Sequence, residues 1–121
     1  MPDDAAARGG IQPVVRLTAD GAGRADVAPD APVELTVEAE VPSGQGTVTH
    51  VEWDIEGTGT WVATPSQPDG TSARLVTTMV HRYPRPGTYF AGVRITSHRE
   101  GEVDATFGRV TNLARARVVV R

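Results

Sequence analysis

The sequence predicts an all-β fold, a sandwich of antiparallel sheets with about seven strands. Valine, alanine and threonine are abundant, a composition typical of strands. Nine prolines leave few windows in which a helix could run for three turns. Several runs alternate apolar and polar residues with a period of two, as a strand with one solvated face does. With 121 residues, the chain can bury one hydrophobic core.

The first half of the chain contains three predicted strands. Residues 14–19 form a short β-rich run that ends at the turn-prone sequence 20–23. Residues 32–40 alternate, with valine, leucine and alanine on one face and glutamate and threonine on the other. Residues 48–55 alternate again, and this pattern predicts Trp53 inside and Asp54 outside.

The second half contains four more. Glycines 57 and 59 turn the chain into a short edge segment around Trp61 and Val62, and residues 64–71 have the composition of a loop. Strands are predicted at 74–83 and 88–97, with a tight corner between them. For the last segment, 110–120, a helix is the alternative prediction, because alanine and arginine are frequent there. The alternation of apolar and polar residues and the β-branched end favour a strand.

The domain organisation is predicted to be simple. Residues 1–11 read as a flexible linker without the basic and apolar regions of a signal peptide, and residues 12–121 as one domain. No apolar stretch approaches the ~20 residues of a membrane span, so membrane insertion is not expected.

Charge and cysteine content exclude some functions. The net charge is −3 and the arginines are spread along the chain, so nucleic acid is not an expected partner. Without cysteine there is neither a disulfide framework nor a thiolate metal site.

Two segments resemble the PKD (polycystic kidney disease repeat) family. Residues 51–59, with Trp53 followed by Asp54, are similar to its W-D-F-G-D-G stretch. Residues 81–89 are similar to its H-x-Y-x-x-P-G-x-Y stretch and are the more specific match. That match keeps five residues at the family's spacing: His81, Tyr83, Pro86, Gly87 and Tyr89.

The same residues have roles that physical chemistry predicts. Trp53 would supply the largest buried surface of a core made of small side chains, and Trp53→Ala should cost ~3–5 kcal/mol. Pro86 and Gly87 would set a tight turn and hence the register of a strand pair. The Tyr83 hydroxyl would meet a backbone group, as in the tyrosine corner of sandwiches.

The resemblance implies a fold and a role. The fold is a seven-stranded immunoglobulin-like antiparallel β-sandwich. The role is that of a non-catalytic accessory or spacer module in a larger extracellular or cell-surface protein, such as a secreted bacterial hydrolase, with adjacent domains of that protein as partners. The chain departs from the family at 56–59, where the acidic residue is displaced.

No catalytic residue, metal ligand or cofactor site is assigned from the sequence. Serine-hydrolase motifs are absent, and a substrate cleft is hard to build in a chain of this size. The three histidines show no local ligand spacing; His81 is expected to hydrogen-bond within its corner. Calcium stays open as a ligand, because loop carboxylates could supply oxygens. These carboxylates are Asp54, Glu56, Asp69 and Asp104.

Two further hypotheses concern the surface. Trp61 and Phe90 could stack on sugars, which makes a polysaccharide- or substrate-binding module the alternative function; Phe107 is expected to cap the core instead. The outward residues of three neighbouring strands could form one mixed surface for docking against another domain. These are His50, Glu52, Phe90, Arg94, Arg115 and Arg117.

Overall fold

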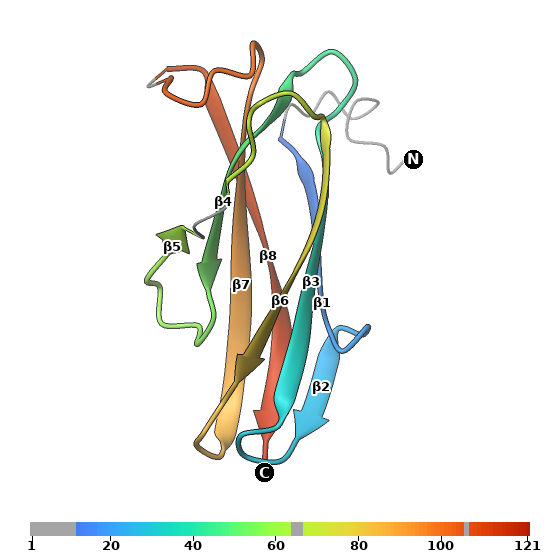
Figure 1. Ribbon diagram of the computed structural model, residues 1–121, viewed down its shortest axis with the longest axis vertical. Helices are drawn as coiled ribbons and strands as arrows, with labels where there is room; N and C mark the ends of the chain where they lie inside the picture. Colours follow the sequence, from blue (N-terminus) through green and yellow to red (C-terminus); the bar gives the residue numbers. More distant parts are fainter. Residues whose placement is uncertain (1–11, 64–66, 106) are drawn as a thin grey trace.

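The computed structural model describes residues 12–63, 67–105 and 107–121. They form two β-sheets around one apolar core, and no helix occurs in the described residues (Figure 1). The strands are β1 (Val14–Ala19), β2 (Arg24–Val27), β3 (Pro32–Glu40), β4 (Thr47–Asp54), β5 (Val62–Ala63), β6 (Arg74–Arg82), β7 (Gly87–His98) and β8 (Arg109–Val120). The linker predicted at 1–11 lies outside the described residues.

The smaller sheet has three strands in the order β1-β3-β6, all antiparallel. Its central strand follows the sequence pattern closely, because every second residue of β3 is buried and the residues between them face outward. The buried residues are Val33, Leu35, Val37 and Ala39. The alternation in residues 32–40 therefore predicted both the strand and its inner face.

The larger sheet has five strands in the order β2-β8-β7-β4-β5. Strands β7 and β8 pair antiparallel over their full length, from Gly87 opposite Val120 to His98 opposite Arg109. The prediction of a strand at 110–120 is confirmed, since β-branched residues at the end of β8 pack into the core.

The strand count and the pairing differ from the prediction in one place. The structure has an eighth strand, β2, which runs parallel to the end of β8. Its four residues are too few for a detectable alternation, and the turn at 20–23 moves the chain from one sheet to the other. Figure 1 shows β2 beside the C-terminal end of the chain.

The predicted corner at Pro86 and Gly87 connects the two sheets. Because β6 and β7 lie in different sheets, the expectation that this turn sets the register of a strand pair is wrong. Gly87 has a φ of 151°, which L side chains avoid. Tyr83, next to this corner, is buried, and its hydroxyl donates to the Ile55 carbonyl at 2.6 Å.

The core contains one tryptophan, as predicted. Trp53 is 2% exposed and lies among valines, alanines and leucines contributed by both sheets. Tyr83 contacts two other rings: the edge of His81 at 4.6 Å between centroids and Tyr89 at 4.5 Å. These contacts hold the crossing segment against the core.

Candidate interaction surface

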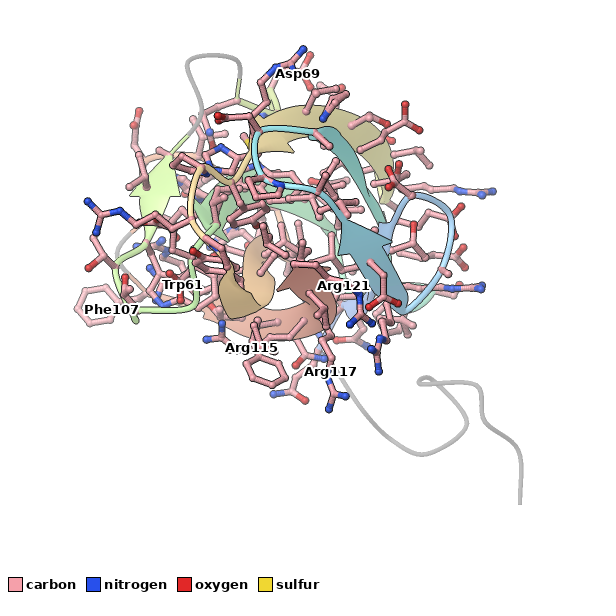
Figure 2. All side chains as sticks on the ribbon, turned by 90° about the horizontal axis from the view of Figure 1, so that it is seen from below. Trp61, Asp69, Phe107, Arg115, Arg117 and Arg121 are labelled. Atoms are coloured by element: carbon pink, nitrogen blue, oxygen red, sulfur yellow. The ribbon has the colours of Figure 1, made fainter. Side chains whose placement is uncertain are left out.

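The outer face of the five-stranded sheet carries most of the predicted surface residues. Strand register sets Glu52 beside Arg94, Phe90 beside Arg117, and Gly92 beside Arg115. Figure 2 shows Trp61, Arg115 and Arg117 on the same side of the molecule. We call this surface the arginine–aromatic face; it consists of Glu52, Trp61, Phe90, Arg94, Leu113, Arg115 and Arg117.

Trp61 packs on this face, where Gly92 leaves room for its indole. A Cβ atom at Gly92 would come within 3.1 Å of the indole Cη2 atom. The guanidinium carbons of Arg94 and Arg115 lie 4.8 and 5.4 Å from the centre of the ring, distances typical of cation–π contacts. Phe90 has a similar contact with Arg117 at 5.5 Å.

Asp54 fixes the loop that carries Trp61. Its carboxylate accepts hydrogen bonds from the backbone N–H groups of Thr58 and Gly59, at 3.0 and 2.9 Å, and from the Arg115 guanidinium at 3.2 Å. Burial alone would raise the pKa of Asp54, but these three donors lower it below its usual range.

The placement of Asp54 corrects the sequence prediction. Asp54 lies on the outer side of β4, as the alternation indicates, yet it is 1% exposed because the loop covers it. Its carboxylate is therefore a structural anchor for the loop.

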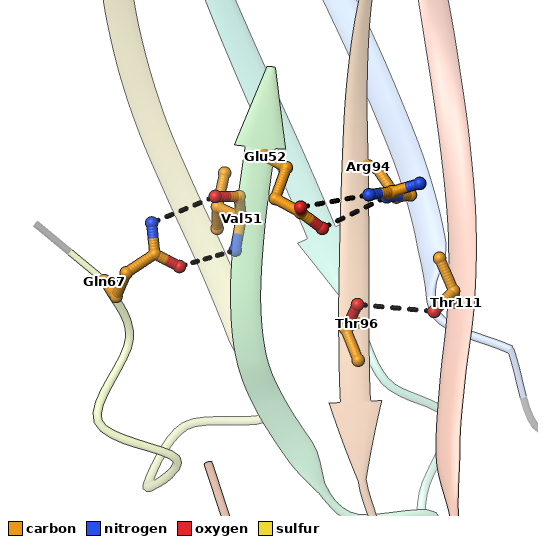
Figure 3. A network of polar contacts seen from close by, with 6 residues as sticks. All are labelled: Val51, Glu52, Gln67, Arg94, Thr96 and Thr111. Atoms are coloured by element: carbon orange, nitrogen blue, oxygen red, sulfur yellow. Dashed lines mark hydrogen bonds and ion pairs between the residues drawn. The ribbon is translucent and has the colours of Figure 1, made fainter. Parts of the chain in front are cut away.

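A second charged pair links β4 to β7. Arg94 donates two hydrogen bonds to the Glu52 carboxylate, at 3.1 and 3.0 Å (Figure 3). Beside it, the hydroxyl oxygens of Thr96 and Thr111 are hydrogen-bonded at 3.3 Å. These two threonines line a hollow of about 430 Å³ with Glu52, Arg94 and Arg109. Bidentate pairs of this kind orient the guanidinium for contacts with other groups.

The edge of β4 is also closed by a side chain. The Gln67 amide donates to the Val51 carbonyl and accepts from the Val51 N–H, both at 3.0 Å (Figure 3). It thereby takes the place of a neighbouring strand at that position.

Charge on this side of the molecule is unevenly balanced. Arg94 and Arg115 are paired with Glu52 and Asp54, and Asp26 is paired with Arg24 and Arg121. Arg109 and Arg117 have no carboxylate within 4 Å among the described residues. The unpaired guanidiniums therefore leave this face with an excess of positive charge.

Among the described residues, the four carboxylates considered as calcium ligands do not form a group of three or more. Asp54 is committed to the loop and Arg115, and Asp69 accepts from the N–H and hydroxyl of Thr71. Asp69 lies on the opposite side of the molecule from Arg115 and Arg117 (Figure 2). In the described part of the chain, no three histidine, cysteine or acidic side chains come close enough to hold a metal ion.

The histidines have separate environments. His50 is hydrogen-bonded to the Thr49 hydroxyl at 2.9 Å. His81 makes the ring contact with Tyr83, and its side chain has no hydrogen bond to any other described residue, contrary to the prediction. His98 is buried, and its Nδ1 atom accepts from the backbone N–H groups of Glu100 and Glu102. No pattern in the sequence indicates this role, because His98 stands where the alternating run of 88–97 ends and a polar loop begins.

Phe107 does not cap the core. It is 87% exposed, and the structure places it in the loop between β7 and β8. Its backbone carbonyl accepts a hydrogen bond from His98 Nε2 at 3.1 Å, so the loop is held by the backbone and the ring is left in solvent.

No part of the described chain forms a helix that is long and apolar enough to cross a membrane. No family model matches this sequence, and a search of curated proteins found no match.

Proposed function

We propose that this chain is a non-catalytic interaction module of the PKD-like, immunoglobulin-like class. The strand order supports this proposal: β1-β3-β6 and β8-β7-β4 follow the A-B-E and G-F-C orders of immunoglobulin-type sandwiches. The buried Trp53 on β4 is a further feature of that class. So is the local bond of a tyrosine corner, which Tyr89 makes in place of the expected Tyr83: its hydroxyl donates to the Arg85 carbonyl, four residues upstream, at 2.9 Å.

The proposed docking surface is the arginine–aromatic face. The observation that carries this proposal is the set of cation–π contacts on this face, in which Arg94 and Arg115 both contact the Trp61 ring and Arg117 contacts the Phe90 ring. Aromatic and arginine side chains dominate binding energy at protein interfaces. Because these groups are already held in place, little conformational entropy would be lost on binding.

The partner we propose is an adjacent domain of a larger secreted or surface protein. The unpaired Arg117, with Arg109 farther along β8, favours an acidic patch on that domain. The exposed side chains of Phe90 and Leu113 favour apolar contacts with it. The module would thus orient its neighbour without contributing to chemistry.

The test uses the domains encoded on either side of this chain, expressed separately. Titration calorimetry should detect binding, and Phe90→Ala or Arg117→Ala should weaken it at least tenfold with unchanged thermal stability. Val80→Ala, on the other sheet, is the matched control and should bind normally. Equal binding by all variants would exclude this face as the docking surface.

Carbohydrate binding through Trp61 and Phe90 is the competing hypothesis. Two guanidiniums already contact the Trp61 ring, which leaves less of it for stacking on a sugar. Retention on insoluble polysaccharide that is lost in Trp61→Ala, together with no binding to the flanking domains, would favour this hypothesis over domain docking.

A further inference from the structure

The two long sides of the sandwich differ. On one side, the Asn112 amide donates to the Pro13 carbonyl at 3.0 Å and the Gln12 amide to the Thr111 carbonyl at 3.4 Å, so β8 is tied to the segment leading into β1. On the other side, β5 and β6 are the last strands of their sheets. Figure 1 shows β5 at the flank opposite to β1 and β2.

Strand β6 has unpaired backbone groups along this open side. The Ala73 carbonyl accepts from Val41 and the Tyr83 carbonyl from Asp30, so odd-numbered residues direct their backbone groups to the β3 side. Even-numbered residues therefore direct theirs to the free edge. Those of Arg74 are covered, because Ser72 Oγ bonds both its N–H and its carbonyl.

This leaves Val76, Thr78 and Val80 as an open edge. No hydrogen bond to their backbone groups on that side occurs among the described residues. The side chains of Val76 and Val80 are 54% and 59% exposed. Natural edge strands are usually protected by charge, proline or a bulge, and residues 75–81 contain no proline and no arginine, lysine, aspartate or glutamate.

An apolar groove adjoins this edge. It has a volume of about 710 Å³ and lies between the β4–β5 segment and β6. Trp53 and Val62 line it from the five-stranded sheet, Ile55 from the segment after β4, and Met79 and His81 from β6. The three-stranded sheet is too narrow to cover this part of the larger sheet, so apolar surface stays accessible here.

We propose that this open side accepts an extended peptide strand from another polypeptide, which would become the fourth strand of the smaller sheet. Its backbone would pair with Val76, Thr78 and Val80, and alternate apolar side chains would fill the groove. A row of alternating N–H and carbonyl groups is matched by another extended backbone and by few other ligands.

Charge defines the ends of the peptide. Arg74 and Arg82 lie at the two ends of β6 on its outer face, so acidic residues directly opposite them would be favoured. A second copy of β6 is a poor occupant, because antiparallel pairing about Thr78 would set Arg74 against Arg82 of that copy. The expected ligand is therefore an apolar-alternating strand with an acidic residue at each end.

The probe is a nine-residue peptide, matching the length of β6: acetyl-Glu-Val-Thr-Leu-Thr-Val-Thr-Val-Glu-amide. Added to ¹⁵N-labelled protein, it should shift the amide resonances of Val76, Thr78 and Val80 and slow their hydrogen exchange. A peptide with lysine at both ends should bind at least tenfold more weakly. Shifts confined to other strands, or equal affinity for both peptides, would contradict the proposal.

Thr78 offers a matched pair of variants. Thr78→Pro removes the N–H at the free edge but no bond to β3, and should weaken peptide binding at least tenfold. Thr78→Ala loses the same hydroxyl contact with Thr36, at 3.2 Å, but keeps the N–H and should bind normally. Equal binding by the two variants would overturn the proposal.

Two measurements keep the test decisive if Thr78→Pro fails to fold. N-methylation of the peptide at residues 3 and 7 blocks one of its edges, and N-methylation at residues 4 and 6 blocks the other. Only one of these two peptides should lose binding, because only one edge of the peptide pairs with β6. Sedimentation equilibrium should show a monomer, whereas a dimer abolished by Val80→Arg, which introduces a charge at the edge, would identify a second copy as the occupant and refute the proposal. Phe90→Ala should leave peptide binding unchanged, which separates this site from the docking surface.

Discussion

At the scale of single residues, position along a strand and burial are separate properties. Asp54 occupies an outward position in β4 but is buried, because the residues after it fold back over it. Its carboxylate accepts three hydrogen bonds, two of them from the backbone of that loop. A buried carboxylate with this many donors stabilises the loop and keeps its own charge.

Asp54→Asn should therefore change the pH dependence of stability. The pKa of Asp54 is lowered by folding, so its contribution is present above the unfolded value of about 4 and is lost as pH falls below it. At pH 7 the variant should lose about 1–3 kcal/mol in the free energy of unfolding, and this loss should shrink between about pH 5 and pH 3. Urea unfolding across pH measures it, with the exposed Glu38→Gln as control; a constant loss would contradict the prediction.

Gly92 is the residue that lets Trp61 approach the sheet. In Gly92→Ala, the new methyl group would lie 2.8 Å from Arg115 Nη1 and 3.1 Å from the indole, so both side chains must move. We expect a shifted Trp61 indole N–H resonance and a loss of about 1–3 kcal/mol. Gly23→Ala has no atom within 4 Å of the new methyl group and should leave both quantities unchanged. An unshifted indole resonance in Gly92→Ala would be inconsistent with this packing.

At the scale of elements, the long connection between β7 and β8 is organised by one buried side chain. His98 Nδ1 accepts from the N–H groups of Glu100 and Glu102, at 3.2 and 3.4 Å, and Nε2 lies 3.1 Å from the Phe107 carbonyl. This pattern requires a proton on Nε2 and none on Nδ1. The imidazole thus links the start of the loop to its end.

His98→Ala should loosen this loop without unfolding the strands. Hydrogen exchange at the amides of Glu100 and Glu102 should become faster by the equivalent of about 1–3 kcal/mol, while amides in the centre of β7 keep their protection. His50→Ala, which removes a contact with Thr49 only, is the control. Unchanged exchange in the loop of His98→Ala would show that other contacts hold it.

At the scale of the whole molecule, both sheets share one core. Leu35 in the three-stranded sheet and Trp53 in the five-stranded sheet belong to the same cluster of buried residues. Strand β2 links the two sheets, because it follows β1 of the smaller sheet in sequence and pairs with β8 of the larger sheet. Such an arrangement is expected to unfold as one cooperative unit.

Leu35→Ala provides the test. It should cost about 2–5 kcal/mol and shift the unfolding midpoint of tryptophan fluorescence by the same amount as the midpoint of far-ultraviolet circular dichroism. Glu38→Ala, on the outer face of the same strand, should change neither midpoint appreciably. Separate midpoints for the two signals would mean that the sheets unfold independently.

Residue pattern by itself determined the all-β class, the inner face of β3, the burial of Trp53 and the strand character of 110–120, because alternation and β-branching act locally. Only the tertiary structure decided the parallel pairing of β2, the crossing of Pro86 and Gly87 between sheets, the burial of Asp54 and the exposure of Phe107. These depend on which distant segments meet, and a period of two contains no information about that.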